Sequence, residues 1–164
     1  MTKVYTGSRV GHSGTAIFVD VLDPPSEDNS GMGDRVKEYP LPFVDKYEWE
    51  RTRLGTPIPM ADTPDSRRHE WGYEGTGAAD TAASLLADWF GEPQPVRITQ
   101  AFKRDIVARL PRDRSWSLSG DQVTAWTEEH AAMIAQARRE AATDQTVLGR
   151  RLSNDTDPGR RLES

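Results

Sequence analysis

The chain has 164 residues, which is enough for one domain of ordinary size. It contains no cysteine, and this excludes a disulfide framework, a thiolate metal site and a cysteine nucleophile. The net charge of −5 argues against nucleic-acid backbone binding as the main task. We expect a cytoplasmic protein with no membrane contact, because the sequence has neither a signal segment nor a membrane-spanning apolar run.

The N-terminal segment predicts a β-hairpin. Residues 3–8 and 15–22 form its two strands, with a glycine-containing turn between them. In the second strand, Ile17, Val19 and Val21 alternate with the residues between them, which is the period of a strand whose two faces have different surroundings.

Residues 23–65 read as a long proline-rich insertion. Seven of the 11 prolines fall there, and no helical or strand period lasts more than a few residues. Within it, residues 39–53 interleave aromatic and charged side chains. This composition is typical of a protein-binding surface and equally of an insertion that folds back over its own domain. The candidate contact residues are Tyr39, Phe43, Tyr47, Trp49, Arg51 and Arg53.

A glycine-punctuated loop at residues 71–79 precedes a helix. The glycines allow a tight turn through positive φ. Residues 67–72, which lead into this loop, read as a short strand or an extended arm. Backbone amides at such a join can hold an anion, but Glu74 and Asp80 place carboxylates there and no lysine follows, so a structural role is favoured. The candidate ligand-binding residues are Tyr73, Gly75, Thr76 and Gly77.

Three helices follow. The spacing of apolar residues predicts helices over 79–90 and 98–110, each ended by a proline-containing turn. A third helix begins with Ser119 and Gln122, which match a capping box, and extends to about Ala141.

The overall prediction is an α+β fold. A small antiparallel sheet, made of the hairpin and the strand near 67–72, packs against three helices within a single domain at residues 1–142. Arginine pairs balanced by acids mark residues 143–164 as a disordered, polar tail.

The sequence offers few catalytic candidates. His69 and Glu70 are a histidine beside a carboxylate, which is the composition of an acid–base pair. Adjacent residues on an extended chain point to opposite faces, so the two are poorly placed to act on one substrate. No metal site and no cofactor is predicted, and a non-catalytic role is favoured.

One set of motifs carries a family resemblance. A Trp-Gly-Tyr-x-Gly-Thr-Gly loop at 71–77 is followed by an alanine- and leucine-rich helix and by a set of later residues. This pattern resembles an uncharacterised family of small bacterial and phage-borne domains with no established function. The later residues that carry it are Phe102, Lys103, Leu110, Pro111, Trp116, Leu118, Ser119 and Trp126. The chain departs from the family's pattern at Glu74, Ala78 and Asp80, where the family has glycine, proline and an amide.

The sequence is therefore compatible with three functional hypotheses. The first is a protein-interaction module of a mobile element or its host, such as an inhibitor of a host defence system, using residues 39–53 and the exposed side of the glycine loop to bind an unknown protein. The second is an enzyme that binds a small anion or nucleotide at residues 72–79. The third is nucleic-acid association through the arginine-rich C-terminal region.

Overall fold

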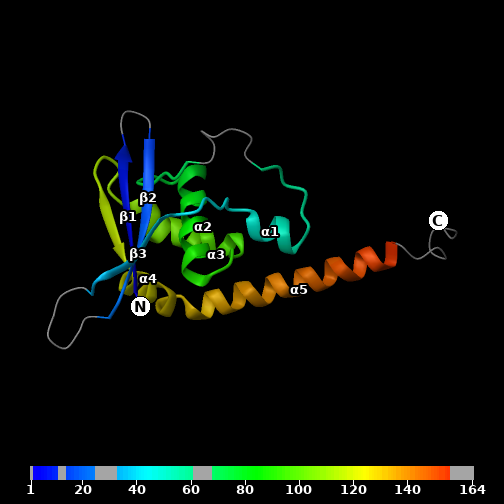
Figure 1. Ribbon diagram of the computed structural model, residues 1–164. Helices are drawn as coiled ribbons and strands as arrows, with labels where there is room; N and C mark the ends of the chain where they lie inside the picture. Colours follow the sequence, from blue (N-terminus) through cyan, green and yellow to red (C-terminus); the bar gives the residue numbers. More distant parts are fainter. Residues whose placement is uncertain (1, 11–13, 25–32, 61–67, 156–164) are drawn as a thin grey trace.

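The computed structural model confirms an α+β fold (Figure 1). It describes residues 2–10, 14–24, 33–60 and 68–155, with side chains described as far as residue 143 and not at Val10. A sheet lies beside a group of helices, and one long helix extends away from both.

The sheet has four antiparallel strands in the order β3-β2-β1-β4. They are β1 (Thr2–Val10), β2 (Gly14–Leu22), β3 (Arg35–Pro40) and β4 (Trp116–Ser119). The predicted hairpin is confirmed as β1 and β2, with Tyr5 opposite Val19.

Five α-helices and one 3₁₀-helix complete the described part of the chain. They are α1 (Glu48–Arg53), α2 (Thr76–Phe90), α3 (Val96–Asp105), η2 (Val107–Arg109), α4 (Gly120–Glu129) and α5 (Ala131–Asp155).

The core lies between the helices and one face of the sheet. Tyr5 and Val19 are fully buried, whereas Phe18, which points to the other face of β2, is 40% exposed. Leu86 of α2 and Phe102 of α3 belong to the same buried cluster as the two strand residues. Helix α2 thus sits at the centre of the domain, with buried residues along most of its length.

The predicted strand near 67–72 is wrong for the residues that the structure describes, 68–72. Here the backbone bonds to side chains and to the 3₁₀-helix η2 instead of a neighbouring strand. The Glu70 N–H donates to the Thr81 hydroxyl at 2.7 Å, and the Gly72 N–H donates to the Val107 carbonyl at 3.0 Å. Gly72 has a φ of +82°, which no regular strand contains. Strands β3 and β4 complete the sheet instead.

The insertion at 23–65 is more regular than its prolines suggest. It contributes β3 and α1, because the backbone of β3 pairs with the free edge of β2, where Tyr39 lies opposite Val19. The side chain of Tyr39 then reaches α2 and donates to Asp88 at 2.6 Å. A strand formed by pairing needs no strong local pattern.

The predicted third helix is two helices. Helix α4 ends at His130, whose φ and ψ are −107° and 16°, and α5 begins directly afterwards. The backbone of α5 continues to Asp155, where the sequence predicts a disordered tail from residue 143; residues 156–164 lie outside the described part. No helix among the described residues is long and apolar enough to cross a membrane.

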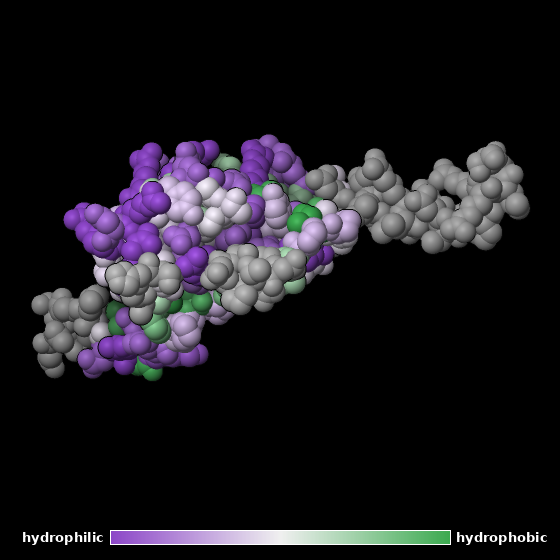
Figure 2. All heavy atoms as spheres, turned by 90° about the horizontal axis from the view of Figure 1, so that it is seen from above, coloured by the Kyte–Doolittle hydropathy of each residue, from purple (hydrophilic) through white to green (hydrophobic). Residues whose placement is uncertain are grey.

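The surface is mostly polar. Figure 2 shows one face of the molecule on which hydrophilic residues predominate and hydrophobic residues occupy small, separate areas. This agrees with a mean hydropathy of −0.72. Large exposed apolar side chains are few among the described residues: Phe18, Val36 and Met60.

Candidate functional site

The insertion lies against α2 and is held there by hydrogen bonds. The Ser84 hydroxyl accepts the Val44 N–H at 2.8 Å and lies 3.0 Å from the Val44 carbonyl oxygen. One turn earlier on α2, the Asp80 carboxylate accepts the Lys46 N–H at 3.0 Å. Burial raises the pKa of Asp80, and the bond from Lys46 opposes that shift. These contacts fix residues 44–46 along the helix.

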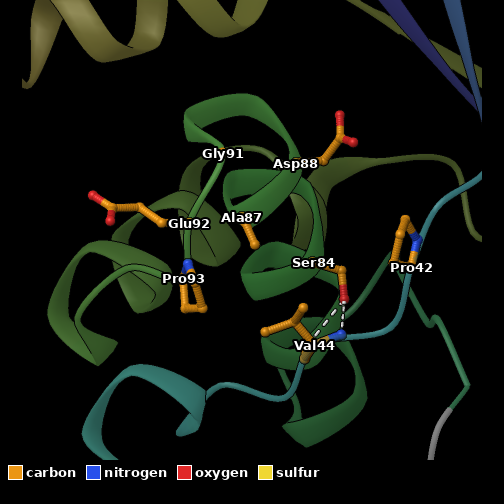
Figure 3. A pocket seen from close by; sticks show the side chains of 8 residues that line it. All are labelled: Pro42, Val44, Ser84, Ala87, Asp88, Gly91, Glu92 and Pro93. Carbon is orange, nitrogen blue, oxygen red and sulfur yellow. Dashed lines mark hydrogen bonds between the residues drawn. The ribbon is translucent and has the colours of Figure 1, made fainter. Parts of the chain in front are cut away.

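Between the insertion and the C-terminal half of α2 there is an open hollow, which we call the α2 hollow. Its volume is about 310 Å³. Figure 3 shows Ala87 between Ser84 and Pro93, with Val44 and Pro42 on the insertion side, while the carboxyl groups of Asp88 and Glu92 point away from Val44. The lining is Pro42, Val44, Ser84, Ala87, Asp88, Gly91, Glu92 and Pro93.

Asp88 is one of two acids that line this hollow, and its carboxylate is bonded to three side chains. Its carboxylate accepts the hydroxyls of Tyr5 at 2.7 Å and Tyr39 at 2.6 Å, and it forms a 3.0 Å ion pair with Lys3. Burial, followed by the bond to Asp88, raises the pKa of both tyrosines, so both remain protonated donors near neutral pH. Asp88 therefore connects β1, β3 and α2.

The second carboxylate at the hollow is also paired. Glu92 bonds to Arg53 at 3.0 Å on the surface, where both side chains are about half exposed. Since the Ser84 hydroxyl is bonded to Val44, every polar side chain that lines the hollow has a partner within the protein. The surface that remains available to a ligand or a partner side chain is the apolar surface of Val44, Ala87 and the prolines.

The predicted protein-contact residues are distributed over the insertion, and most of them contact their own domain. Tyr39 bonds to Asp88, Phe43 packs against His69 with ring centroids 5.7 Å apart, and Tyr47 lies under the Lys46 ammonium at 4.9 Å.

The remaining three predicted contact residues lie on α1. Arg51 bonds to Asp45 at 2.9 Å and to the Ile58 carbonyl at 2.8 Å, which closes the turn after the helix. Arg53 pairs with Glu92, and Trp49 lines a separate hollow between α1, α3 and α5. Of the two interpretations, the structure supports an insertion that folds back over its own domain.

The glycine loop builds the N-terminus of α2. Gly75 is the N-cap residue in an extended conformation with no side-chain cap, and Thr76 is the first helical residue. Gly77 faces Glu70 and the Tyr73 hydroxyl so closely that an added Cβ would lie 2.9 Å from each. Of the two carboxylates predicted to oppose an anion there, that of Asp80 accepts the Lys46 N–H.

The candidate pair His69 and Glu70 is not brought together. His69 is 9% exposed, and its Nε2 lies 3.1 Å from the Leu41 carbonyl oxygen. Burial lowers the pKa of His69, which keeps the ring neutral. The Glu70 carboxylate lies on the other side of the chain, 4.0 Å from Arg9. The described residues also contain no group of three potential metal-ligating acids or histidines.

Sequence reasoning missed the residues that form the α2 hollow. Ser84, Ala87 and Asp88 lie on a helix whose small residues indicate close packing, and their partners are 40 or more residues away. Asp88 was the one residue that could have indicated these contacts from the sequence. A carboxylate among the apolar residues of a central helix requires hydrogen-bond donors from another element.

The comparisons with known proteins give a family match over one segment of the chain and no activity. Residues 51–129 match the model of a family of unknown function, DUF6166. This agrees with the expected resemblance to an uncharacterised family. The DUF6166 segment includes α2, the glycine loop and β4, whereas β1, β2 and β3 lie outside it. No curated protein and no solved structure matches the chain.

Proposed function

We propose that this protein is a non-catalytic module that binds another protein, and that the α2 hollow receives an apolar side chain of the partner. The observation that carries the proposal is the chemistry of the hollow. Its polar side chains are all bonded within the protein, so its exposed surface is supplied by Val44, Ala87, Pro42 and Pro93.

The size of the hollow supports a single side chain as the anchor. A volume of about 310 Å³ lies at the lower limit for drug-sized ligands. Protein interfaces concentrate their energy in a few side chains that fill desolvated pockets. Burying one leucine-sized side chain contributes about 1.5–3 kcal/mol, which is roughly a 10- to 150-fold change in affinity.

The walls of the hollow are pre-organised. The backbone N–H and carbonyl of Val44 are both bonded to the Ser84 hydroxyl, and the Arg53 guanidinium of α1 pairs with Glu92 at 3.0 Å. A pocket that does not have to order on binding loses less conformational entropy when the partner docks.

Among the described residues that line the hollow, the hydroxyl of Ser84 and the carboxylates of Asp88 and Glu92 are all bonded within the protein, and this favours binding over catalysis there. The family resemblance supports carriage by a phage or other mobile element, and inhibition of a host defence system is one form that the proposed interaction takes. The exposed side of the glycine loop is a second part of the surface available to the partner, since Glu74 and Thr76 are exposed.

The test is native capture with two matched variants. Ala87→Glu fills the hollow with a charged side chain, and Ala125→Glu makes the same change at an exposed position of α4. A protein captured by the wild type and by Ala125→Glu, but at least about tenfold less by Ala87→Glu, is the expected result. The captured protein is then purified and its affinity for each variant is measured.

Equal affinity of the purified partner for both variants would refute the role of the hollow. Capture of nothing specific by the wild type, in extracts of the natural host, would count against the interaction function itself. Thermal unfolding of both variants checks that the glutamates leave the fold intact.

A further inference from the structure

Another hollow lies near the N-terminal end of α2 and shares no residue with the α2 hollow. It is lined by Arg9 of β1, by Glu70 before the glycine loop, and by Arg112 and Asp113 after η2, and its volume is about 740 Å³. We call it the arginine hollow. Arg9 and Arg112 both lie on the protein surface, so their guanidinium groups are accessible.

Both guanidinium groups are oriented by aromatic rings of the glycine loop. The Arg9 guanidinium lies 5.4 Å from the centroid of Trp71, and that of Arg112 lies 5.2 Å from the centroid of Tyr73. The Arg9 Nε–H also donates to the Arg112 carbonyl oxygen. Stacking fixes a guanidinium plane while it leaves the edge of the plane, which carries the N–H donors, open to a ligand.

The glycine at position 72 permits this arrangement. It has a φ of +82°, and a Cβ there would lie 2.7 Å from the Cβ of Arg112. Trp71 is in turn fixed from below by Trp116, with ring centroids 5.3 Å apart in an edge-to-face contact. The arginines thus stand on a rigid base of two tryptophans and a tight loop.

The ion pairing within the hollow is incomplete. Arg9 meets Glu70 only at 4.0 Å, the limit of an ion pair. For Arg112, none of the ion pairs among the described residues involves its guanidinium, although Asp113 is its neighbour in the chain. The two oriented guanidinium groups therefore keep N–H donors that are available to a ligand.

We propose that the arginine hollow binds an oxyanion, a phosphate or a carboxylate group, through the guanidinium groups of Arg9 and Arg112. Planar guanidinium matches the geometry of both groups and bonds to them through two parallel N–H donors. This differs from the predicted site on the amides of residues 75–77, because the ligand contacts are side chains on β1 and on the loop after η2. In this site the Tyr73 ring stacks against Arg112 and positions its guanidinium group, and Tyr73 does not contact the ligand itself.

Glu70 and Asp113 set the strength of the interaction. With two cations and two anions the lining carries no net formal charge, so long-range attraction is small and the affinity comes from directed hydrogen bonds. We expect dissociation constants for small free anions in the range of about 0.1–10 mM.

The experiment titrates the full-length protein with inorganic phosphate and, separately, with malonate, at constant ionic strength kept by chloride. Amide chemical shifts in two-dimensional NMR spectra report the site, and their saturation reports the affinity. The phosphate and malonate arms distinguish a preference for phosphate from a preference for carboxylate. The variants are Arg112→Gln, Arg112→Lys and, as a control, Arg104→Gln, whose side chain is 63% exposed on α3.

The expected result is saturable shifts at Glu70, Tyr73 and Arg112, with affinity reduced at least about tenfold by Arg112→Gln, partly retained by Arg112→Lys and unchanged by Arg104→Gln. If Arg112→Gln lowers the melting temperature, Arg112→Lys and the location of the shifts in the wild type still decide the question. No saturable shift at these residues with either anion at about 50 mM, or equal binding by all variants, would overturn the proposal.

Discussion

Removal of the Asp88 carboxylate should destabilise the protein more than any other single change at an acid on α2, because Asp88 connects β1, β3 and α2. In Asp88→Ala the hydroxyl of Tyr5, whose side chain is fully buried, loses its hydrogen-bond acceptor. Hydrogen bonds to charged groups contribute about 1.5–3 kcal/mol, and a buried donor without a partner costs about 1–3 kcal/mol. Lys3 is more exposed, so its ion pair adds little.

Summed without double counting, Asp88→Ala should lower the free energy of unfolding by about 3–5 kcal/mol. This is a large part of the total for an ordinary domain, and it corresponds to a fall in melting temperature of roughly 6–20 °C. Tyr39→Phe removes one donor at a half-buried position and should cost about 0.5–1.5 kcal/mol.

Urea unfolding followed by tryptophan fluorescence measures these values, with Glu128→Ala on the exposed side of α4 as the control. A double-mutant cycle between Tyr39→Phe and Asp88→Ala isolates the coupling across the insertion. An unfolding free energy of Asp88→Ala within about 0.5 kcal/mol of the control would show that the Asp88 carboxylate does not hold β1, β3 and α2 together.

Three further outcomes are expected. The raised pKa of Tyr5 means that its contribution is complete below pH 10, the ordinary value, and is lost as the pH rises above it, so Tyr5→Phe should flatten the alkaline side of a stability profile measured by urea unfolding. Gly7→Ala should cost about 2–4 kcal/mol in the same assay, because the new Cβ would overlap the Trp116 ring, whereas Gly55→Ala, with open space around it, should cost about 1 kcal/mol. The Trp126 indole N–H lowers the pKa of Asp105, so this stabilisation is present above the ordinary value of 3.8 and is lost as the pH falls through the lowered pKa; Asp105→Asn should remove that loss, and an unchanged acid profile would contradict it.

Local patterns predicted the elements whose own residues determine them. The alternation at Ile17 and Val19 gave the hairpin, and the serine and glutamine at 119 and 122 gave a helix start. There the Ser119 hydroxyl accepts the Gln122 N–H at 3.2 Å, and the Gln122 side chain accepts the Ser119 N–H at 2.8 Å. Such signals lie within a few residues and need no tertiary context.

The remaining features depend on contacts that are distant in the sequence. Strand β3 forms because β2 offers a free edge and Asp88 accepts the Tyr39 hydroxyl from 49 residues away. The break between α4 and α5 has no glycine or proline to mark it. It occurs where the His130 ring stacks on Trp126 at 4.5 Å and its Nε2 lies 3.2 Å from Asp105 of α3. A single sequence does not contain these pairings in readable form.

The candidate sites follow the same division. The glycine loop was singled out for its own amides, and the structure gives it a second role as the base on which Arg9 and Arg112 stack. The α2 hollow could not be predicted, because its two walls come from residues 42–44 and 84–93 and meet only in the folded protein.

Site-specific photo-crosslinking tests the proposed binding role of the α2 hollow most directly. A photoreactive amino acid is placed at position 87 in one variant and at the exposed position 125 in another, and both are irradiated in extracts of the natural host. We expect a discrete crosslinked protein from position 87 that is absent at position 125 and is competed away by unlabelled wild type. The same crosslinks from both positions, or none from position 87, would contradict it.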